Sequence, residues 1–449
     1  MNLEMNLRTE TVDYEKYYQE IWTHPLLEIK GRVTQVIGLV LEVRGLRLFV
    51  GEVCLVEVNN GGEPVLAEVV GFRQGRALLM PLGNLSGIGP GCLVKGTGSP
   101  FMVKVGSGIL GKVLDALGKP ILESEHLDGP FEDYLVENSP PNPLEREPIT
   151  KVMATGVRAI DTLLTCGQGQ RIGIFSGSGV GKSSLMGMIA RYSEADVNVI
   201  GLVGERGREV LDFVRNDLGP EGLKRSVLIV STSDRPALER VKAALTATAV
   251  AEYFRDQGKK VILMMDSVTR FAMALREIGL AIGEPPATKG YTPSVFATLP
   301  RLLERSGTSR SGSITGFYTV LVDGDDFNEP IADAVRGILD GHIVLSRNLA
   351  SQNHYPAIDI LDSVSRLMPY IVDEEHFRQA GALRELLSVY RESEDLISIG
   401  AYVEGSNARV DRAIAYREPL NRFLRQGLSE SVSWQNSRKA LSGLLSSAS

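Results

Sequence analysis

Residues 177–184 read Gly177-Ser178-Gly179-Val180-Gly181-Lys182-Ser183-Ser184, and this stretch decides the fold. It follows the apolar run 171–175 and precedes the apolar run 185–190, so it lies where a strand turns into a helix. Glycines let backbone N–H groups surround phosphate oxygens, and the positive end of the following helix strengthens the field. Lys182 supplies a point charge, and the Ser183 hydroxyl suits a magnesium ligand. The stretch therefore predicts a phosphate-binding loop whose ligand is a nucleotide.

One position departs from the strict pattern for such loops. A glycine is expected six residues before the lysine, and this chain has Ser176 there. The remaining glycines and the change from strand to helix are retained. We therefore interpret the stretch as a binding loop rather than as a glycine-rich turn without a ligand.

Two acidic residues follow strands next to this loop in the expected sheet. Hydrolysis of a nucleotide needs a carboxylate that orients water and an acid that holds the magnesium shell. Glu205 follows the buried-type strand 199–203, and Asp266 follows the apolar strand 261–265. Ligands gather at the carboxyl ends of parallel strands, so both acids are candidates for these tasks. The alternatives are that Glu205 is a solvated loop acid and that Asp266 caps the next helix.

Residues from about 150 to 373 resemble the catalytic core shared by rotary ATP synthases and type III export ATPases. The resemblance is closest to the flagellar and injectisome export ATPase family. It implies an α/β fold: a small N-terminal β-barrel, a central RecA-like nucleotide-binding domain with a parallel sheet, and a C-terminal helical domain. It also implies ATP and Mg²⁺ as ligands. The similarity rests on residues 175–185, 203–210, 263–271, 283–294, 322–330 and 351–359.

The resemblance assigns catalytic and metal-binding roles to individual residues. Besides the loop as a whole, it implies that Lys182 contacts the outer phosphates and that Ser183 binds the magnesium ion. Glu205 would act on the attacking water. Asp266 would hold the water shell of the metal, with Glu209 further out.

The resemblance also implies three arginines and one aromatic residue in the site. Arg206 and Arg270 match positions that brace the phosphate end of the nucleotide. Arg366 matches the arginine finger that reaches into the site of the neighbouring subunit. Tyr355 aligns with the residue that stacks on adenine, whereas Leu428 stands where the rotary enzyme has a Phe. We therefore expect loose selectivity for the base.

Composition limits the classes of function. Across 449 residues, 48 Lys and Arg stand against 55 Asp and Glu, a net charge of −7, so no general basic field favours nucleic acid or anionic lipid. Cys54, Cys92 and Cys166 are far apart and lack metal-ligand spacing, which predicts reduced thiols. The amino terminus lacks the pattern of a secretion signal, and no long uncharged apolar run occurs. We expect a cytoplasmic protein.

The texture of the chain predicts four parts. Residues 1–25 form an amphipathic helix, for which the resemblance implies docking, and residues 26–98 form a β-barrel of short strands broken by glycines. Residues 99–372 form the ATPase core, which includes the Pro-rich connector 139–148. Residues 373–449 form the helical domain.

The amino-terminal helix carries a large apolar stripe: Tyr14, Tyr17, Tyr18, Ile21 and Trp22. A helix this short is marginal alone, so the stripe must be buried against another surface. One alternative is packing on the chain's own barrel. The other, implied by the export ATPase family, is binding of a regulatory, stator-like partner.

Several functional classes compete. A non-catalytic ring subunit would carry Gln in place of Glu205, and a hexameric nucleic-acid translocase would show a basic, aromatic barrel. The barrel strands 39–43 and 53–58 have neither property. The catalytic subunit of a rotary ATP synthase is the nearest alternative. Its helical domain meets a basic shaft through an acidic run, whereas the corresponding residues 401–409 contain one acid.

The resemblance therefore favours a homohexameric ATPase of a flagellar-type export apparatus that releases or unfolds cargo. One chain holds both Glu205 and Arg366, so identical subunits can complete every site between neighbours. The implied partners are a stator-like protein, a central stalk-like protein, export chaperones with cargo, and the membrane export gate that the ring meets from the cytoplasmic side. Nucleic acid is not expected as a partner. Flagellar service is favoured over injectisome service by overall resemblance.

Overall fold

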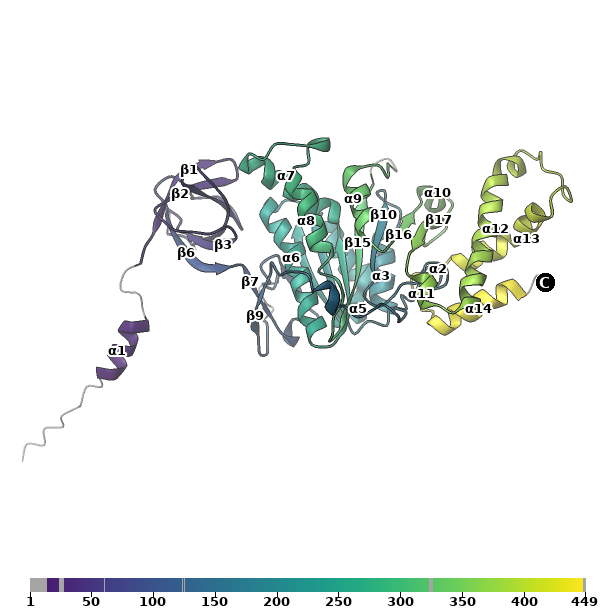
Figure 1. Cartoon of the computed structure of the whole chain (residues 1–449), viewed down its shortest axis with the longest axis horizontal. Coiled ribbons are helices and arrows are strands. Elements are labelled where there is room, and N and C mark those ends of the chain that lie inside the picture. The colour runs from purple at the N-terminus through teal and green to yellow at the C-terminus, as the bar shows by residue number, and fades with distance from the viewer. Residues whose placement is uncertain are drawn as a thin grey trace, which may run out of the picture. The chain divides into compact units, whose positions relative to one another are not determined.

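The computed structural model (Figure 1) describes residues 14–23, 28–59, 61–122, 124, 126–322 and 326–446. The chain divides into two compact units. The smaller unit comprises Met1–Pro81 and Leu85–Ser99, and the larger comprises Leu82–Asn84 and Pro100–Ser449. The four-part division made from the sequence stays a prediction.

The smaller unit contains helix α1 (Tyr14–Thr23) and a closed antiparallel barrel. Short strands alternate inward and outward, so the barrel interior is filled by small and branched side chains such as Val43, Val56 and Leu79. Gln74 and Gly75, both with positive φ, form the tight turn between two of the strands. The predicted barrel is therefore confirmed. Its described strands, in the order β1-β2-β5-β4-β3-β6, are β1 (Gly31–Ile37), β2 (Val40–Arg44), β3 (Glu52–Val56), β4 (Val65–Arg73), β5 (Arg76–Pro81) and β6 (Leu93–Pro100).

The larger unit is built on the predicted parallel sheet. Its central strands are buried along nearly their whole length because helices cover both faces. The strand order is β17-β16-β10-β15-β13-β11-β12-β8, and β17 and the short β14 run antiparallel to their neighbours. The strands are β8 (Val113–Asp115), β10 (Arg171–Ser176), β11 (Val197–Glu205), β12 (Ser226–Thr232), β13 (Lys260–Asp266), β14 (Gly307–Thr308), β15 (Ser313–Leu321), β16 (Gly341–Leu345) and β17 (Ile358–Ser365). A separate ribbon pairs β7 (Met102–Val105) with β9 (Glu132–Leu135).

Helices follow the strands in the alternating order expected of an α/β fold. Helix α6 (Ala237–Asp256) packs on β11, β12 and β13, and α7 (Val268–Ile282) contacts α6 and β15. The other helices before the carboxyl-terminal segment are α2 (Arg158–Leu163), α3 (Lys182–Tyr192), α4 (Gly207–Asp212), α5 (Gly219–Lys224), α8 (Pro293–Leu303), α9 (Pro330–Ile338), α10 (Arg347–Ser351) and α11 (Met368–Ile371). Single-turn or π-helical pieces are η1 (Ser107–Ile109), η2 (Pro143–Glu145), η3 (Phe213–Leu218) and η4 (Thr288–Gly290).

The carboxyl-terminal segment is helical, as predicted, and consists of α12 (Glu374–Ser398), α13 (Ala408–Leu424) and α14 (Trp434–Ser446). These helices share one hydrophobic core with α2 and α3: Leu383, Tyr416 and Phe423 belong to the same buried cluster as Ile160 and Met186. Polar contacts add to this packing. The guanidinium of Arg384 on α12, for example, donates to the carbonyl oxygens of Leu163, Ile360 and Ser363 at 2.8–3.3 Å.

Two expectations from composition concern thiols and membranes. Cys54, Cys92 and Cys166 are all buried and form no disulfide. Among the helices of the described residues, none is both long and apolar enough to cross a membrane.

Candidate nucleotide-hydrolysis site

The glycine-rich loop joins β10 to α3, as the sequence predicts. Gly179 and Gly181 have φ of 77° and 89°, values that favour glycine, and Gly181 is the residue before the first turn of α3. The backbone N–H groups of that turn are therefore presented to a ligand together with the helix dipole. The loop lines a cleft of about 480 Å³ through all its predicted residues except Val180, which is buried.

Strands β11 and β13 bring the two predicted acids to the lysine of this loop. Glu205 is the last residue of β11, and Asp266 is the last residue of β13. Lys182 Nζ lies 2.5 Å from Asp266 Oδ1 and 3.8 Å from Glu205 Oε1. Ser267, not Asp266, caps α7, because its side chain accepts a hydrogen bond from the backbone N–H of Arg270. Asp266 is therefore available to the cleft.

The environment of Glu205 favours a proton-accepting role near neutral pH. Burial is the largest influence on its carboxyl group, and the negative charge of Asp266 adds to it, so the pKa of Glu205 is raised to about 7. Lys182 opposes this shift, whereas the hydrogen bond and charge of Glu209 reinforce it. A general base works best when its pKa lies near the operating pH. Its place in the cleft and its raised pKa suit Glu205 to the predicted role of base, which stays a prediction.

The cleft fits a magnesium ion that arrives with a nucleotide. Mg²⁺ prefers oxygen ligands and is held in such sites by one or two protein groups plus phosphates and water. Ser183, Glu209 and Asp266 all line the cleft. Two further oxygens, Ser176 Oγ and Glu205 Oε1, are buried and have no hydrogen-bond partner among the described residues. The donor set therefore suits the predicted metal, without forming a protein-only cage.

Two of the predicted arginines line the same cleft. Arg206 is mostly exposed and lies 3.7 Å from Glu209. Arg270 packs against Gly204, where a side chain would come within 3.0 Å of its Cβ atom, and its buried Nε has no hydrogen-bond partner among the described residues. Both guanidinium groups are therefore placed to meet an anionic ligand.

Tyr355 lies beside the nucleotide-binding loop rather than in the cleft itself. A Cβ atom on Gly181 would lie 3.3 Å from the ring of Tyr355, and 39% of this tyrosine is exposed. The carbonyl oxygen of Leu428 accepts hydrogen bonds from Arg191 and Tyr192 at the far end of α3. The adenine-stacking role of Tyr355 and the loose base selectivity stay predictions.

Arg366 is not part of this cleft. It follows the end of β17, where Ser365 pairs with Gly341, whereas the nucleotide-binding loop begins after Ser176, which pairs with Leu345. Four residues of β16 separate the two levels, about 13 Å along the sheet. Arg366 is exposed, and its guanidinium donates to the carbonyl oxygen of Arg336 at 3.4 Å.

The sequence reasoning missed two polar residues at the site. Thr319 on β15 donates a hydrogen bond of 2.7 Å to Asp266 Oδ1 and so fixes the carboxylate that pairs with Lys182. Ser176 was noted only as a mismatch, yet its buried hydroxyl lines the cleft. A signal existed for Ser176, which ends the strand before the loop. Nothing in the local sequence distinguishes Thr319 from other buried threonines.

Three family profiles match the chain. Residues 33–98 match the β-barrel domain of the ATP synthase alpha/beta family, and residues 156–365 match its nucleotide-binding domain. Residues 372–443 match the C-terminal domain of the type III secretion ATPase EscN. Together these matches bear out the resemblance and the fold class predicted from the sequence.

The chain is also similar to known proteins of this kind over most of its length. The flagellum-specific ATP synthase of Bacillus subtilis (strain 168) is 58% identical over 92% of this chain and 94% of its own length. A type 3 secretion system ATPase of Xanthomonas euvesicatoria is 50% identical over 93% of this chain and 94% of its own. The assembled EscN of enteropathogenic E. coli, solved with its central stalk EscO, superposes with a TM-score of 0.86 and 44% identity, covering 92% of this chain and all of that one. The chain belongs to the family of flagellum-specific ATP synthases and type 3 secretion system ATPases.

Proposed function

We propose that this ATPase acts as a homohexameric ring in a flagellar-type export apparatus, where ATP hydrolysis releases or unfolds cargo at the export gate. Each active site lies between two copies of the chain. One copy supplies Lys182, Glu205 and Asp266, and the next copy supplies Arg366 as the arginine finger.

The observation that carries this proposal is the separation of Arg366 from the cleft. Lys182, Glu205 and Asp266 converge within a few ångströms, whereas Arg366 lies about 13 Å further along the sheet. An arginine that acts on the phosphates must come from another copy, and a closed ring of identical subunits provides such a copy at every site.

Individual residues have separate roles in the proposed ATP hydrolysis. Lys182 and the backbone N–H groups of the loop bind the outer phosphates, and Glu205 orients the attacking water and accepts its proton. Ser183 and Asp266, with Glu209 further out, would hold the magnesium ion, which neutralises charge on the phosphates. Arg206 and Arg270 brace the phosphate end. Arg366 of the neighbouring copy stabilises the charge that develops during transfer.

The proposed partners would bind exposed apolar side chains in the amino-terminal helix and in the carboxyl-terminal helical segment. Helix α1 exposes Tyr14, Tyr17 and Tyr18 to 56–68%, which supports a stator-like partner there. The side chains of Ile21 and Trp22 lie outside the described residues. At the tip between α12 and α13, Ile399 and Val403 are at least 70% exposed, which supports a central stalk-like protein or an export chaperone. The ring would work in the cytoplasm, at the membrane-embedded gate, and without nucleic acid.

Mixing two inactive variants tests the shared site. Glu205→Gln removes the base and Arg366→Ala removes the finger, and each change alone should abolish turnover; loss of a finger costs about 10³-fold or more. An equimolar mixture should recover activity, because some interfaces pair an intact Glu205 with an intact Arg366. Absence of recovery in rings shown by mass measurement to contain both variants would contradict the proposal.

A further inference from the structure

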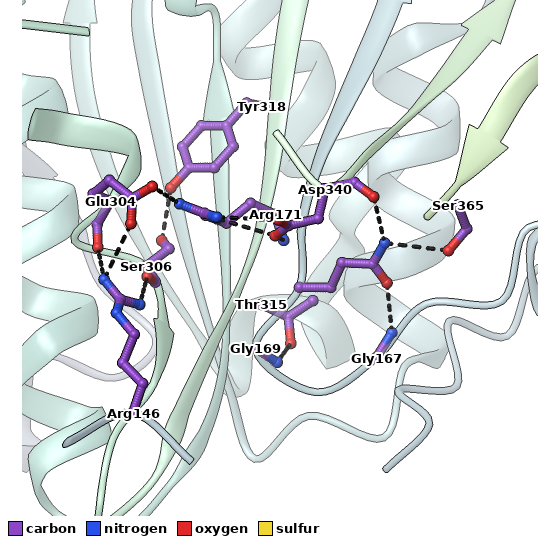
Figure 2. Close-up of polar contacts among 11 residues, drawn as sticks. Arg146, Gly167, Gly169, Arg171, Glu304, Ser306, Thr315, Tyr318, Asp340 and Ser365 are labelled. Atoms are coloured by element: carbon purple, nitrogen blue, oxygen red, sulfur yellow. Dashed lines mark hydrogen bonds and ion pairs between the residues drawn. The ribbon is translucent and has the colours of Figure 1, made fainter. Parts of the chain in front are cut away.

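A chain of polar contacts crosses the amino-terminal edge of the central sheet, away from the nucleotide-binding loop (Figure 2). It leads from Arg146, in the Pro-rich connector, through Glu304, Arg171 and Asp340 to the end of β17. Arg366 follows directly. We propose that Arg171 and Asp340 are positioning residues that hold Arg366 in place for the site of the neighbouring subunit. This inference rests on the proposed function.

Asp340 makes two kinds of contact: its side chain binds Arg171 on β10, and its backbone carbonyl oxygen binds Arg366. Its carboxylate accepts hydrogen bonds from Arg171 Nε and Nη2, both at 3.0 Å, and from the backbone N–H of Arg171 at 3.1 Å. Its carbonyl oxygen accepts the backbone N–H of Arg366 at 3.0 Å. The bidentate pair fixes the orientation of Asp340. The backbone of the finger is thereby tied to the first residue of β10.

Gln170 adds a second link beside the first. It is fully buried, and its Nε2 donates to both the carbonyl oxygen of Asp340 and the hydroxyl of Ser365, each at 3.2 Å. Its Oε1 accepts the backbone N–H of Gly167 at 2.8 Å, and Ser365 Oγ donates to the carbonyl oxygen of Thr165 at 2.7 Å. Ser365, the residue before the finger, is therefore also hydrogen-bonded to this edge of the sheet.

Glu304 extends the network towards the connector. Its carboxylate pairs with the guanidinium of Arg171, and its backbone and side-chain oxygens accept from Arg146 (Figure 2). Arg146 also donates to the carbonyl oxygen of Ser306 at 2.8 Å. Burial lowers the pKa of Arg171, but the hydrogen bonds and charges of Asp340 and Glu304 outweigh burial and raise it above its ordinary value. Arg171 therefore stays charged at neutral and alkaline pH.

The exposure of Arg366 explains why this network matters for catalysis. Among the described residues, the guanidinium of the finger has one long hydrogen bond, 3.4 Å to the carbonyl oxygen of Arg336, so its position depends on the backbone at residues 365 and 366. Misplacement of a catalytic group by about 1 Å can cost about 10²-fold in rate. A loosened Asp340 would displace Arg366 without touching Lys182 or Glu205, which lie at the other edge of the sheet.

The variant Asp340→Asn keeps the shape of the side chain and removes the charge that orders Arg171. It should lower kcat by about 10- to 100-fold and change KM less than about twofold. Arg171→Lys, which keeps the charge and loses the bidentate geometry, should act in the same direction. Asp196→Asn is the matched control. Asp196 also precedes a strand and accepts the backbone N–H of Lys260 at 2.8 Å, but four strands separate its strand, β11, from β17.

Mixing distinguishes positioning of the finger from damage to the variant's own cleft. If Asp340 acts through Arg366, the Asp340→Asn chain has an intact cleft and a misplaced finger. Mixing it with Glu205→Gln, which supplies an intact finger, should raise the activity per Asp340→Asn chain. Mixing it with Arg366→Ala, which supplies no finger, should not raise it. Damage to the variant's own cleft reverses both results and would overturn the inference. So would full activity of Asp340→Asn and Arg171→Lys, or loss of rings in sedimentation. If instead Glu205→Gln and Arg366→Ala fail to complement each other, the proposed function itself is wrong.

Discussion

Replacing Glu205 by Gln changes one atom of the cleft and removes its proposed base. The amide keeps the volume of a side chain that is 12% exposed, and Lys182 stays paired with Asp266 at 2.5 Å, so the binding surface for phosphates is preserved. The amide cannot accept the proton of the attacking water. Loss of a general base costs about 10²- to 10⁴-fold, which corresponds to about 3–5 kcal/mol in the activation free energy.

Steady-state phosphate release measures the rate, and titration calorimetry with ATP and Mg²⁺ measures the affinity. Glu205→Gln should bind ATP with an affinity within a few-fold of the unmodified chain while hydrolysing it at least about 100-fold more slowly. Lys182→Ala is the contrasting variant and should lose affinity as well as rate. If Glu205→Gln hydrolysed ATP at half the normal rate, Glu205 would not be the base.

Three further predictions follow from charge, burial and exposure. Because Glu205 must be deprotonated to act as a base, kcat/KM should rise as the pH increases through about 7. Glu209→Gln removes an influence that raises the pKa of Glu205, so it should move this rise to lower pH. A pH profile that did not move would assign the titration to another group. Glu252→Gln should lower the free energy of unfolding in denaturant titration by about 3–5 kcal/mol, because it leaves the buried guanidinium of Arg305, now held at 2.6 Å and 2.9 Å, without its charge partner; replacing both residues by apolar ones should cost much less. Deleting residues 1–23 should preserve the melting temperature and basal ATPase activity and abolish binding of a stator-like partner, whereas aggregation or a drop of several degrees would place the stripe in the chain's own core.

The fold and the centre of the site could be predicted because their signals are local. Glycines between an apolar strand and an apolar helix specify a phosphate loop within eight residues. Glu205 and Asp266 were found because each ends an apolar run, and the ends of parallel strands meet at one edge. The structure shows the same residues ending β11 and β13, with both carboxylates within 4 Å of Lys182.

Contacts between distant parts of the chain could not be predicted in this way. Arg171 and Asp340 are 169 positions apart, and the sequence around each residue does not indicate that the two form an ion pair. Thr319 fixes Asp266 across a strand pair that no periodicity reveals. Arg366 was identified by family resemblance alone, since by composition it is one arginine in a polar segment. Such residues depend on the register and order of strands, which pattern reasoning does not supply.

The charges in the cleft indicate which groups attract the nucleotide. Its lining carries as many basic as acidic side chains, so a net positive field does not attract the phosphates; these residues are Lys182, Arg206, Arg270, Glu205, Glu209 and Asp266. The backbone N–H groups of the loop and the dipole of α3 are then expected to add to the local attraction by Lys182 and the two arginines. Phosphate oxygens compete with Asp266 for the ammonium group of Lys182. If Lys182 turned to the phosphates, the buried Asp266 would keep only the hydrogen bond from Thr319 among the described residues and would favour another cation. From the pairing of Lys182 with Asp266 we therefore expect binding of the nucleotide to be coupled to binding of its metal.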